Sequence, residues 1–339
     1  MSSHWRETLN EYVRMLNQFE VHCSIDSLLP LLLDEQYKDM QRKRLSRFKE
    51  RSQERNLKLK KSETRMKILK FQNGYNQKDV EIQLKRYYLY EVNHKRFEEE
   101  RIEKQRIILK NEKGEWLIQR VEQPVPERTY CKNPPIATVN PHIKAQPLSL
   151  SVQNLSAPYM NEQLLNRASS KKSYRYQRLK VKSYADAWWE KPNPDFRAFN
   201  DDCTNFVSQC IYAGGASMNY TKNRTSGWWY HSDREQDGWS FSWTVSQCLK
   251  NYLLSKSSGL RAETVEDPEQ LQVGDVIFYD WDGDSKFQHS AIVTGKDDKG
   301  QPLVNARTVN SKHRYWDYKD SYAWSNKTKY SFCHIYDTL

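Results

Sequence analysis

The chain has 339 residues, a length that suits two domains, each large enough to bury a core of its own. Its 54 Lys and Arg residues outnumber its 43 Asp and Glu residues, which gives a formal net charge of +11. This balance suits either a polyanionic partner or a basic protein that has none. No basic block alternates with aromatic residues in the way that base stacking requires, so we expect no nucleic-acid partner.

Neither a signal peptide nor a membrane-spanning helix is predicted. Residues 1–18 mix charged and apolar side chains without an apolar core. The longest apolar run, Leu28–Leu33, is interrupted by Pro30 and falls far short of the roughly 20 residues that a membrane helix needs. We therefore expect a cytoplasmic protein, for which action on a cell wall would need another route of release.

The cysteines contain no C-x-x-C pair, so a structural zinc site is not expected. The chain is large and has no dense cysteine framework, which favours buried, reduced thiols over disulfides. We expect one of the six to be reactive: Cys23, Cys131, Cys203, Cys210, Cys248 or Cys333.

The N-terminal third shows first a helical and then a strand pattern. Apolar side chains recur every three or four positions over residues 4–20, which predicts an amphipathic helix. The charged residues 34–61 predict a solvated helix or loop. From Val80 the period changes to two, as in strands with one wet face, and residues 106–119 predict a hairpin. This order of elements resembles NTF2-like domains, so we expect an α+β domain over residues 1–122.

A linker is predicted over residues 123–173, because prolines interrupt any periodicity there and Ser and Asn are frequent. The domain before it shows no His, Asp or Tyr constellation typical of an enzyme. Its expected role is to present the C-terminal half or to pair with it.

The most informative segment begins at Asp202. A helix is predicted over residues 203–213, because a Gly-Gly pair follows and apolar residues recur three, four, seven and eight positions after Cys203. The Cys203 thiol therefore lies on the core side, in the first helical turn. There the helix dipole and free backbone N–H groups favour a thiolate and can bind an oxyanion. The alternative is a buried, inert cysteine, as we expect for Cys210.

A thiolate nucleophile needs an imidazole that accepts and returns its proton. His289 begins a predicted strand over residues 289–294. If the face of this strand that carries small residues packs on the Cys203 helix, the ring of His289 emerges beside the N-terminus of that helix. His313 lies in a polar turn and His334 near the C-terminus, so both fit this role less well. A structural role for His289 is the alternative.

The C-terminal half resembles a known family. Asp202–Val207 is similar to the Asp-Cys-Ser-Gly-Phe-Val motif of papain-like cell-wall endopeptidases, which are related to CHAP domains. Over residues 174–339 the chain resembles, more closely, the amidase domain found in Firmicutes. This resemblance implies an α+β papain-like fold, with the nucleophile helix on a small antiparallel sheet. The motifs that carry it are Ala187–Trp189, Asp202–Gln209, Ala213–Gly215, Gly227–Tyr230, Asp280–Asp284, His289–Val293 and Leu303–Ala306.

The resemblance also implies a reaction, which is hydrolysis of an amide through an acyl-enzyme. Cys203 attacks, His289 transfers the proton and Asn305 orients the imidazole. No cofactor is needed, and the implied substrate is peptidoglycan or a peptide derived from it. The amidase domain commonly carries His where this chain has Arg307, and a cation there would oppose a protonated His289. The residues expected to bind substrate are Asp202, Trp228, Trp229 and Arg307.

Two other functions stay open. One is a non-catalytic wall-binding or scaffolding module, with Arg307 as the mark of a degenerate triad. The other is an acyltransferase that passes the acyl group from Cys203 to an amine. Asp280–Asp284 is similar to a short calcium loop but lacks the distal Glu of an EF-hand. A polar hairpin turn before His289 is the commoner explanation for such a segment, and no metal site is predicted.

Overall fold

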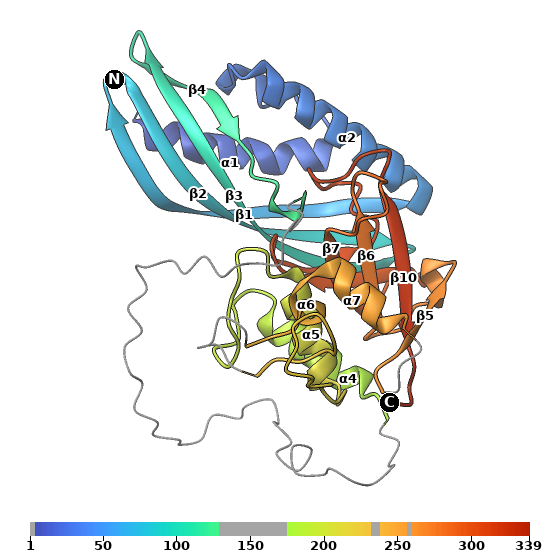
Figure 1. Ribbon diagram of the computed structural model, residues 1–339. Coiled ribbons are helices and arrows are strands. Elements are labelled where there is room, and N and C mark those ends of the chain that lie inside the picture. The colour runs from blue at the N-terminus through green and yellow to red at the C-terminus, as the bar shows by residue number, and fades with distance from the viewer. Residues whose placement is uncertain (1–3, 129–174, 232–237, 256–258) are drawn as a thin grey trace, which may run out of the picture.

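One antiparallel sheet of ten strands runs through both halves of the chain (Figure 1). The computed structural model describes residues 4–128, 175–231, 238–255 and 259–339. Within these ranges the strand order is β1-β2-β3-β9-β8-β7-β6-β10-β5, and β4 pairs with β3. The expected mixed α+β class is confirmed, whereas the finer likenesses to papain-like and NTF2-like folds stay predictions.

The predicted amphipathic helix is confirmed as α1 (Trp5–His22), which begins with a capping box between His4 and Glu7. The charged stretch after it forms α2 (Glu35–Arg55), capped by Asp34. This helix is not simply solvated, because three of its arginines are buried: Arg44, Arg51 and Arg55.

Four strands follow these helices: β1 (Leu57–Gly74), β2 (Gln77–Val92), β3 (Lys95–Glu112) and β4 (Glu115–Glu122). The predicted period of two is confirmed in β2, where Val80, Ile82 and Leu84 are buried in the core that α1 covers. The predicted hairpin is the β3–β4 turn, in which Gly114 has a φ of +93°. Two short 3-10 turns are η1 (Leu29–Leu31) and η2 (Pro126–Arg128).

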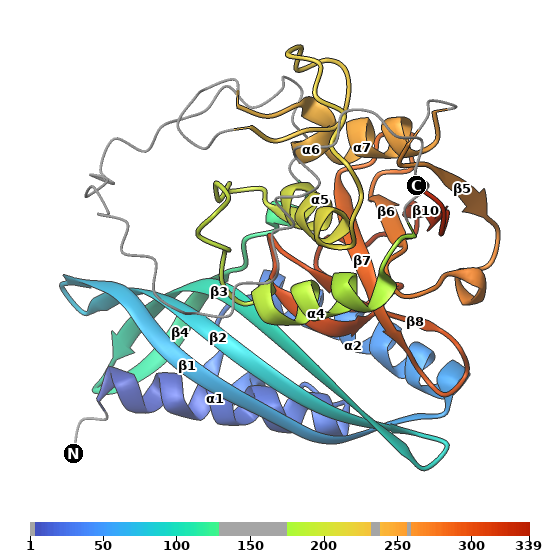
Figure 2. The same ribbon diagram turned by 90° about the horizontal axis from the view of Figure 1, so that it is seen from below.

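The C-terminal half contributes α4 (Arg178–Trp188), α5 (Cys203–Ala213), α6 (Phe241–Thr244), α7 (Ser246–Leu253), β5 (Ala262–Val265), η3 (Pro268–Gln270), β6 (Val276–Asp280), β7 (His289–Lys296), β8 (Pro302–Ala306), β9 (Ser311–Tyr315) and β10 (Lys329–Ile335). Helices α4 to α7 cover one face of its strands (Figure 2), where Phe206 packs in one core with Ile292. The opposite face carries a second core around Tyr279 and Trp281, which residues 316–324 and η2 cover.

The two halves meet where β3 pairs with β9, with Glu100 opposite Lys312 and Arg101 opposite Ser311. Most of the predicted linker, residues 129–173, lies outside the described residues, so the division into domains stays a prediction. Among the helices described, none is both long and apolar enough to cross a membrane.

Candidate active site

Cys203 is the first residue of α5, and its side chain and backbone are both enclosed. The residue is 6% exposed. Thr308, which follows β8, accepts two hydrogen bonds through Oγ1: from the N–H of Asp202 at 2.9 Å and from that of Cys203 at 3.1 Å. The helix starts where predicted, but the Cys203 N–H is not free to bind an oxyanion because Thr308 occupies it.

The thiol of Cys203 lies against polar side chains. Its Sγ is 3.7 Å from Thr204 Oγ1, which is 3.1 Å from Ser290 Oγ on β7. Burial raises the pKa of the Cys203 thiol, and hydrogen bonds from Thr204 and Ser290 offset this only in part. The expected fall of this pKa is therefore wrong, because desolvation outweighs the favourable position at the helix N-terminus.

His289 is fully buried at the start of β7, inside a cage of aromatic rings. Its ring centroid lies 5.4 Å from that of Tyr279, 5.9 Å from Trp281 and 5.5 Å from Tyr318. Neither ring nitrogen has a hydrogen-bond partner among the described residues. Burial, helped by the nearby charge of Arg314, lowers the pKa of His289 to about 3. The imidazole is therefore neutral at physiological pH.

The structure does not bring His289 to Cys203. Ser290 and Ile292 of β7 face α5, since Ser290 meets Thr204 and Ile292 belongs to the helix-covered core. Side chains alternate along a strand, so His289 points to the other face, toward Tyr279. The expected position of His289 beside the helix N-terminus is wrong, because the Ser290 face of β7 packs on α5.

Asn305 is also placed away from His289. Its Oδ1 accepts hydrogen bonds from Thr294 Oγ1 at 2.9 Å and from the N–H of His313 at 2.8 Å. Its Nδ2 donates to Asp186 Oδ1 at 2.9 Å, and His313 Nε2 lies 3.1 Å from the same oxygen. Asn305 therefore organises an Asp186–His313 pair, which sequence reasoning missed because Asp186 is 127 residues from His313 in the chain.

Asp186 is charged in this cluster. Burial works to raise the pKa of Asp186, but hydrogen bonds from His313 and Lys182 hold it well below its usual value. Among the described residues, no cysteine or hydroxyl is hydrogen-bonded to this Asp–His pair. The pair alone therefore lacks a nucleophile.

Arg307 lies on the thiol's side of the sheet, where it forms a buried ion pair. Its Nη1 is 3.1 Å from Asp202 Oδ2, and the two residues are 7% and 2% exposed. The other carboxylate oxygen of Asp202 accepts hydrogen bonds from the N–H of Phe199 and from Asn205 Nδ2. Asp202 and Arg307, the two charged residues predicted to bind substrate, are thus paired with each other. A substrate carboxylate would have to displace Asp202 to reach Arg307.

Trp228 and Trp229 are 0% and 2% exposed. Trp228 packs against Trp243, with ring centroids 4.9 Å apart, and donates a hydrogen bond to Ser208 Oγ at 3.0 Å. Substrate could reach neither indole without opening this core, so the structure places both residues in packing.

The loop after β6 closes on itself. The carboxylate of Asp280 accepts hydrogen bonds from the backbone N–H groups of residues 282–285. No group of three or more His, Cys, Asp or Glu side chains that could hold a metal ion occurs in the part of the chain that the structure describes. Five cysteines are free thiols, and Cys131 lies outside the described residues.

Known proteins resemble part of this chain. "Uncharacterized protein YhbB" of Bacillus subtilis (strain 168) is 48% identical over 166 residues, which are 49% of this chain and 52% of that protein. "Uncharacterized protein YjcM" of the same organism is 33% identical over 153 residues, 42% of this chain and 33% of that protein. The chain thus spans about half, or less, of the length of these relatives.

A solved structure, "Crystal structure of intermembrane space region of chloroplast protein ARC6", aligns with a TM-score of 0.28 and 11% identity, over 35% of this chain and 92% of that one. This likeness is too weak to bear on the fold. Residues 175–333 match the model of the family described as "Putative amidase domain". This segment contains Cys203, His289 and Arg307.

Proposed function

We propose that residues 175–333 act as a cysteine-dependent amide hydrolase with Cys203 as its nucleophile. The observation that carries this proposal is the position of Cys203, at the first residue of a buried helix on an antiparallel sheet, within a segment that matches an amidase family model. Such a helix on such a sheet also supports a papain-like fold for residues 174–339. An NTF2-like fold for residues 1–122 remains a proposal that rests on the order of its elements.

In the proposed reaction the sulfur of Cys203 attacks the carbonyl carbon of an amide, and the thiol proton leaves with the amine. Water then hydrolyses the thioester and releases the acid and the free thiol. The substrate class is peptidoglycan or a peptide from it, and the net charge of +11 suits an anionic wall polymer.

The base in this proposal is His289, whose neutral imidazole can accept a proton. Its ring lies on the face of β7 opposite to the thiol, so the described arrangement is a resting form in the proposed mechanism. Proton transfer requires the start of β7 to rearrange. Asn305 has no place in the mechanism in this arrangement, because its amide is engaged with Asp186 and His313.

A second candidate is a non-catalytic module that binds wall peptides. Three observations favour it: the thiol's pKa is raised, Thr308 occupies the N–H of Cys203, and Arg307 is paired with Asp202 at the helix N-terminus. In such a module Cys203 is a packing residue.

Turnover separates the two candidates. Peptidoglycan fragments incubated with the protein are analysed by chromatography for released peptides, with and without an added amine. The hydrolase predicts release that is lost in Cys203→Ala and kept in Cys210→Ala, a matched control on the same buried helix. Binding of the fragments without release, in both variants and in the parent chain, would establish the module instead.

A further inference from the structure

Residues 316–324, here called the strap, form one wall of the cage around His289. Tyr318 is fully buried, and its ring centroid lies 5.5 Å from that of His289 and 4.9 Å from that of Tyr279. The strap belongs to the C-terminal half, but no helix of that half covers it. The C-terminal half itself holds the strap through contacts such as that of Arg314 with Asp320, at 3.1 Å, and that of Tyr330 with the carbonyl oxygen of Asp317, at 2.7 Å. Further contacts come from the N-terminal half and from η2.

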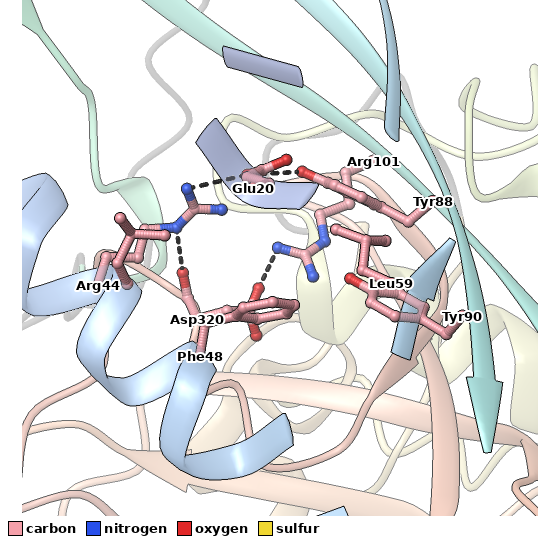
Figure 3. A pocket seen from close by; sticks show the side chains of 9 residues that line it. Glu20, Arg44, Phe48, Leu59, Tyr88, Tyr90, Arg101 and Asp320 are labelled. Atoms are coloured by element: carbon pink, nitrogen blue, oxygen red, sulfur yellow. Dashed lines mark hydrogen bonds and ion pairs between the residues drawn. The ribbon is translucent and has the colours of Figure 1, made fainter. Parts of the chain in front are cut away.

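Arginines of α2 hold the backbone of the strap. Arg44 Nε donates to the carbonyl oxygen of Asp320 at 2.9 Å, and Arg47 Nε donates to that of Lys319 at 2.7 Å. Figure 3 shows Arg44 between this carbonyl group and the carboxylate of Glu20 on α1, which is 3.2 Å away. These contacts join α1, α2 and the strap.

Arginines also hold the carboxylates of the strap. Arg51 Nη1 lies 3.1 Å from Asp317 Oδ1 and 2.9 Å from Asp320 Oδ1. Arg101 of β3 pairs with the other oxygen of Asp320, as Figure 3 shows. Arg51, Arg101 and both aspartates are at most 5% exposed. Arg314 also lies 3.1 Å from Asp320, so removing Arg51 leaves Asp317, rather than Asp320, buried without a counterion among the described residues, which is destabilising.

The other end of the strap is held by η2. Ser321 Oγ donates to Glu127 Oε2 at 2.9 Å, and Arg128 Nε donates to the carbonyl oxygen of Ala323 at 2.8 Å. The carbonyl oxygen of Glu127 accepts a hydrogen bond from Trp281 Nε1 at 2.8 Å, so η2 touches a second wall of the His289 cage.

We propose that the N-terminal half, together with η2, is an intramolecular clamp on the strap, and that this clamp keeps His289 sealed inside the protein. The clamp consists of the strap contacts of Arg44, Arg47, Arg51, Arg101, Glu127 and Arg128. The opposite face of the sheet is packed by α4 to α7 and does not depend on these contacts. Loosening the clamp therefore opens the His289 cage before it disturbs the nucleophile helix. The inference does not rest on the proposed activity.

The test measures how fast diethyl pyrocarbonate modifies each histidine of the full chain, read by mass spectrometry. In Arg51→Met, the rate at His289 rises at least about tenfold over the parent chain, because a buried charge pair is broken. The rate at the exposed His231, whose ring stacks on that of Tyr220, stays constant and serves as the internal reference. The matched control is Arg42→Met, on the exposed side of the same helix, where Arg42 meets Asp39 at 2.5 Å.

Asp317→Asn keeps the test decisive if Arg51→Met does not fold. It removes one of two carboxylate partners of Arg51, and Asp320 remains. The clamp predicts a folded protein by circular dichroism, with faster modification of His289 and faster hydrogen exchange in residues 316–324. An unchanged rate at His289 in every folded clamp variant, or an equal rise in Arg42→Met, would overturn the proposal.

Discussion

The imidazole of His289 begins β7 and points away from α5, whereas the thiol of Cys203, at the start of α5, lies against the opposite face of β7. Each of the two groups is in its neutral form. Burial lowers the pKa of His289 to about 3 and raises that of the Cys203 thiol. At the scale of single residues, desolvation therefore dominates both groups. The side of the sheet that holds the thiol carries Arg307, already paired with Asp202, rather than an imidazole.

The stability of the protein should fall on acidification because of His289. Its pKa moves from 6.5 to about 3 on burial, so between these values the unfolded chain binds a proton that the folded chain does not. The stability present above pH 6.5 is lost as the pH falls toward 3. The free energy of unfolding is measured with urea at pH 7 and at pH 4.5. Between these two values it should fall by about 2–3 kcal/mol less in His289→Phe than in the parent chain. Equal losses would show that His289 does not titrate in this way.

Arg307→His would supply an imidazole on the thiol's side of the sheet. A neutral imidazole there can accept the thiol proton, and general bases typically contribute about 10²–10⁴-fold. We expect alkylation of Cys203 by iodoacetamide at pH 7 to accelerate at least about tenfold, measured by peptide mass spectrometry. Arg307→Gln removes the charge without adding a base and should give no such gain. The same rate in both variants would mean that position 307 does not reach the thiol.

At the scale of elements, the sequence predicted the helices and strands better than the faces they present. The α5 bounds follow from apolar spacing and the Gly-Gly pair, and both agree with the structure. In β7 every residue from His289 to Thr294 is buried, so polarity does not distinguish the face that meets α5. Every residue of β8 is buried as well, so polarity could not show which way Asn305 points. The sequence predicted that Asn305 orients His289, but its side chain is hydrogen-bonded to the backbone N–H of His313.

Thr308 caps the start of α5, and its loss should be measurable. Thr308→Val keeps the branched shape but removes the oxygen that accepts from Asp202 and Cys203. We expect a loss of about 1 kcal/mol in the free energy of unfolding, the usual value for a helix N-cap. Thr308→Ser keeps the hydroxyl group, so its free energy of unfolding should stay close to that of the parent chain. If Thr308→Val and Thr308→Ser lower the free energy of unfolding by the same amount, the hydroxyl group does not stabilise this end of the helix.

At the scale of the whole molecule, the two halves share a sheet and a buried set of charges. Sequence patterns predicted a helix followed by strands in the first half, but not this junction. One reason is distance along the chain, since Arg51 and Asp320 are 269 residues apart. The other is that the charge of α2 predicts solvent exposure for its arginines, whereas three of them are buried. The pairing of β3 with β9 involves two residue pairs and has no local signature.

The shared interface predicts that the halves stay together after the chain is cut. Limited proteolysis is expected first within residues 123–173, where composition predicts a linker. The two fragments should then elute as one species on size exclusion at low and high salt, because the buried pairs are shielded from added ions. Two separate peaks would show that the halves are independent.

Trapping the acyl-enzyme decides whether Cys203 is a nucleophile. The full chain is mixed with a short peptide thioester, quenched in acid within seconds and mapped by mass spectrometry. We expect an acyl group on Cys203 that is lost over time as the thioester hydrolyses. The same adduct should form in Cys210→Ala. No adduct, or an adduct on another cysteine with Cys203 unmodified, would show that Cys203 is not the nucleophile.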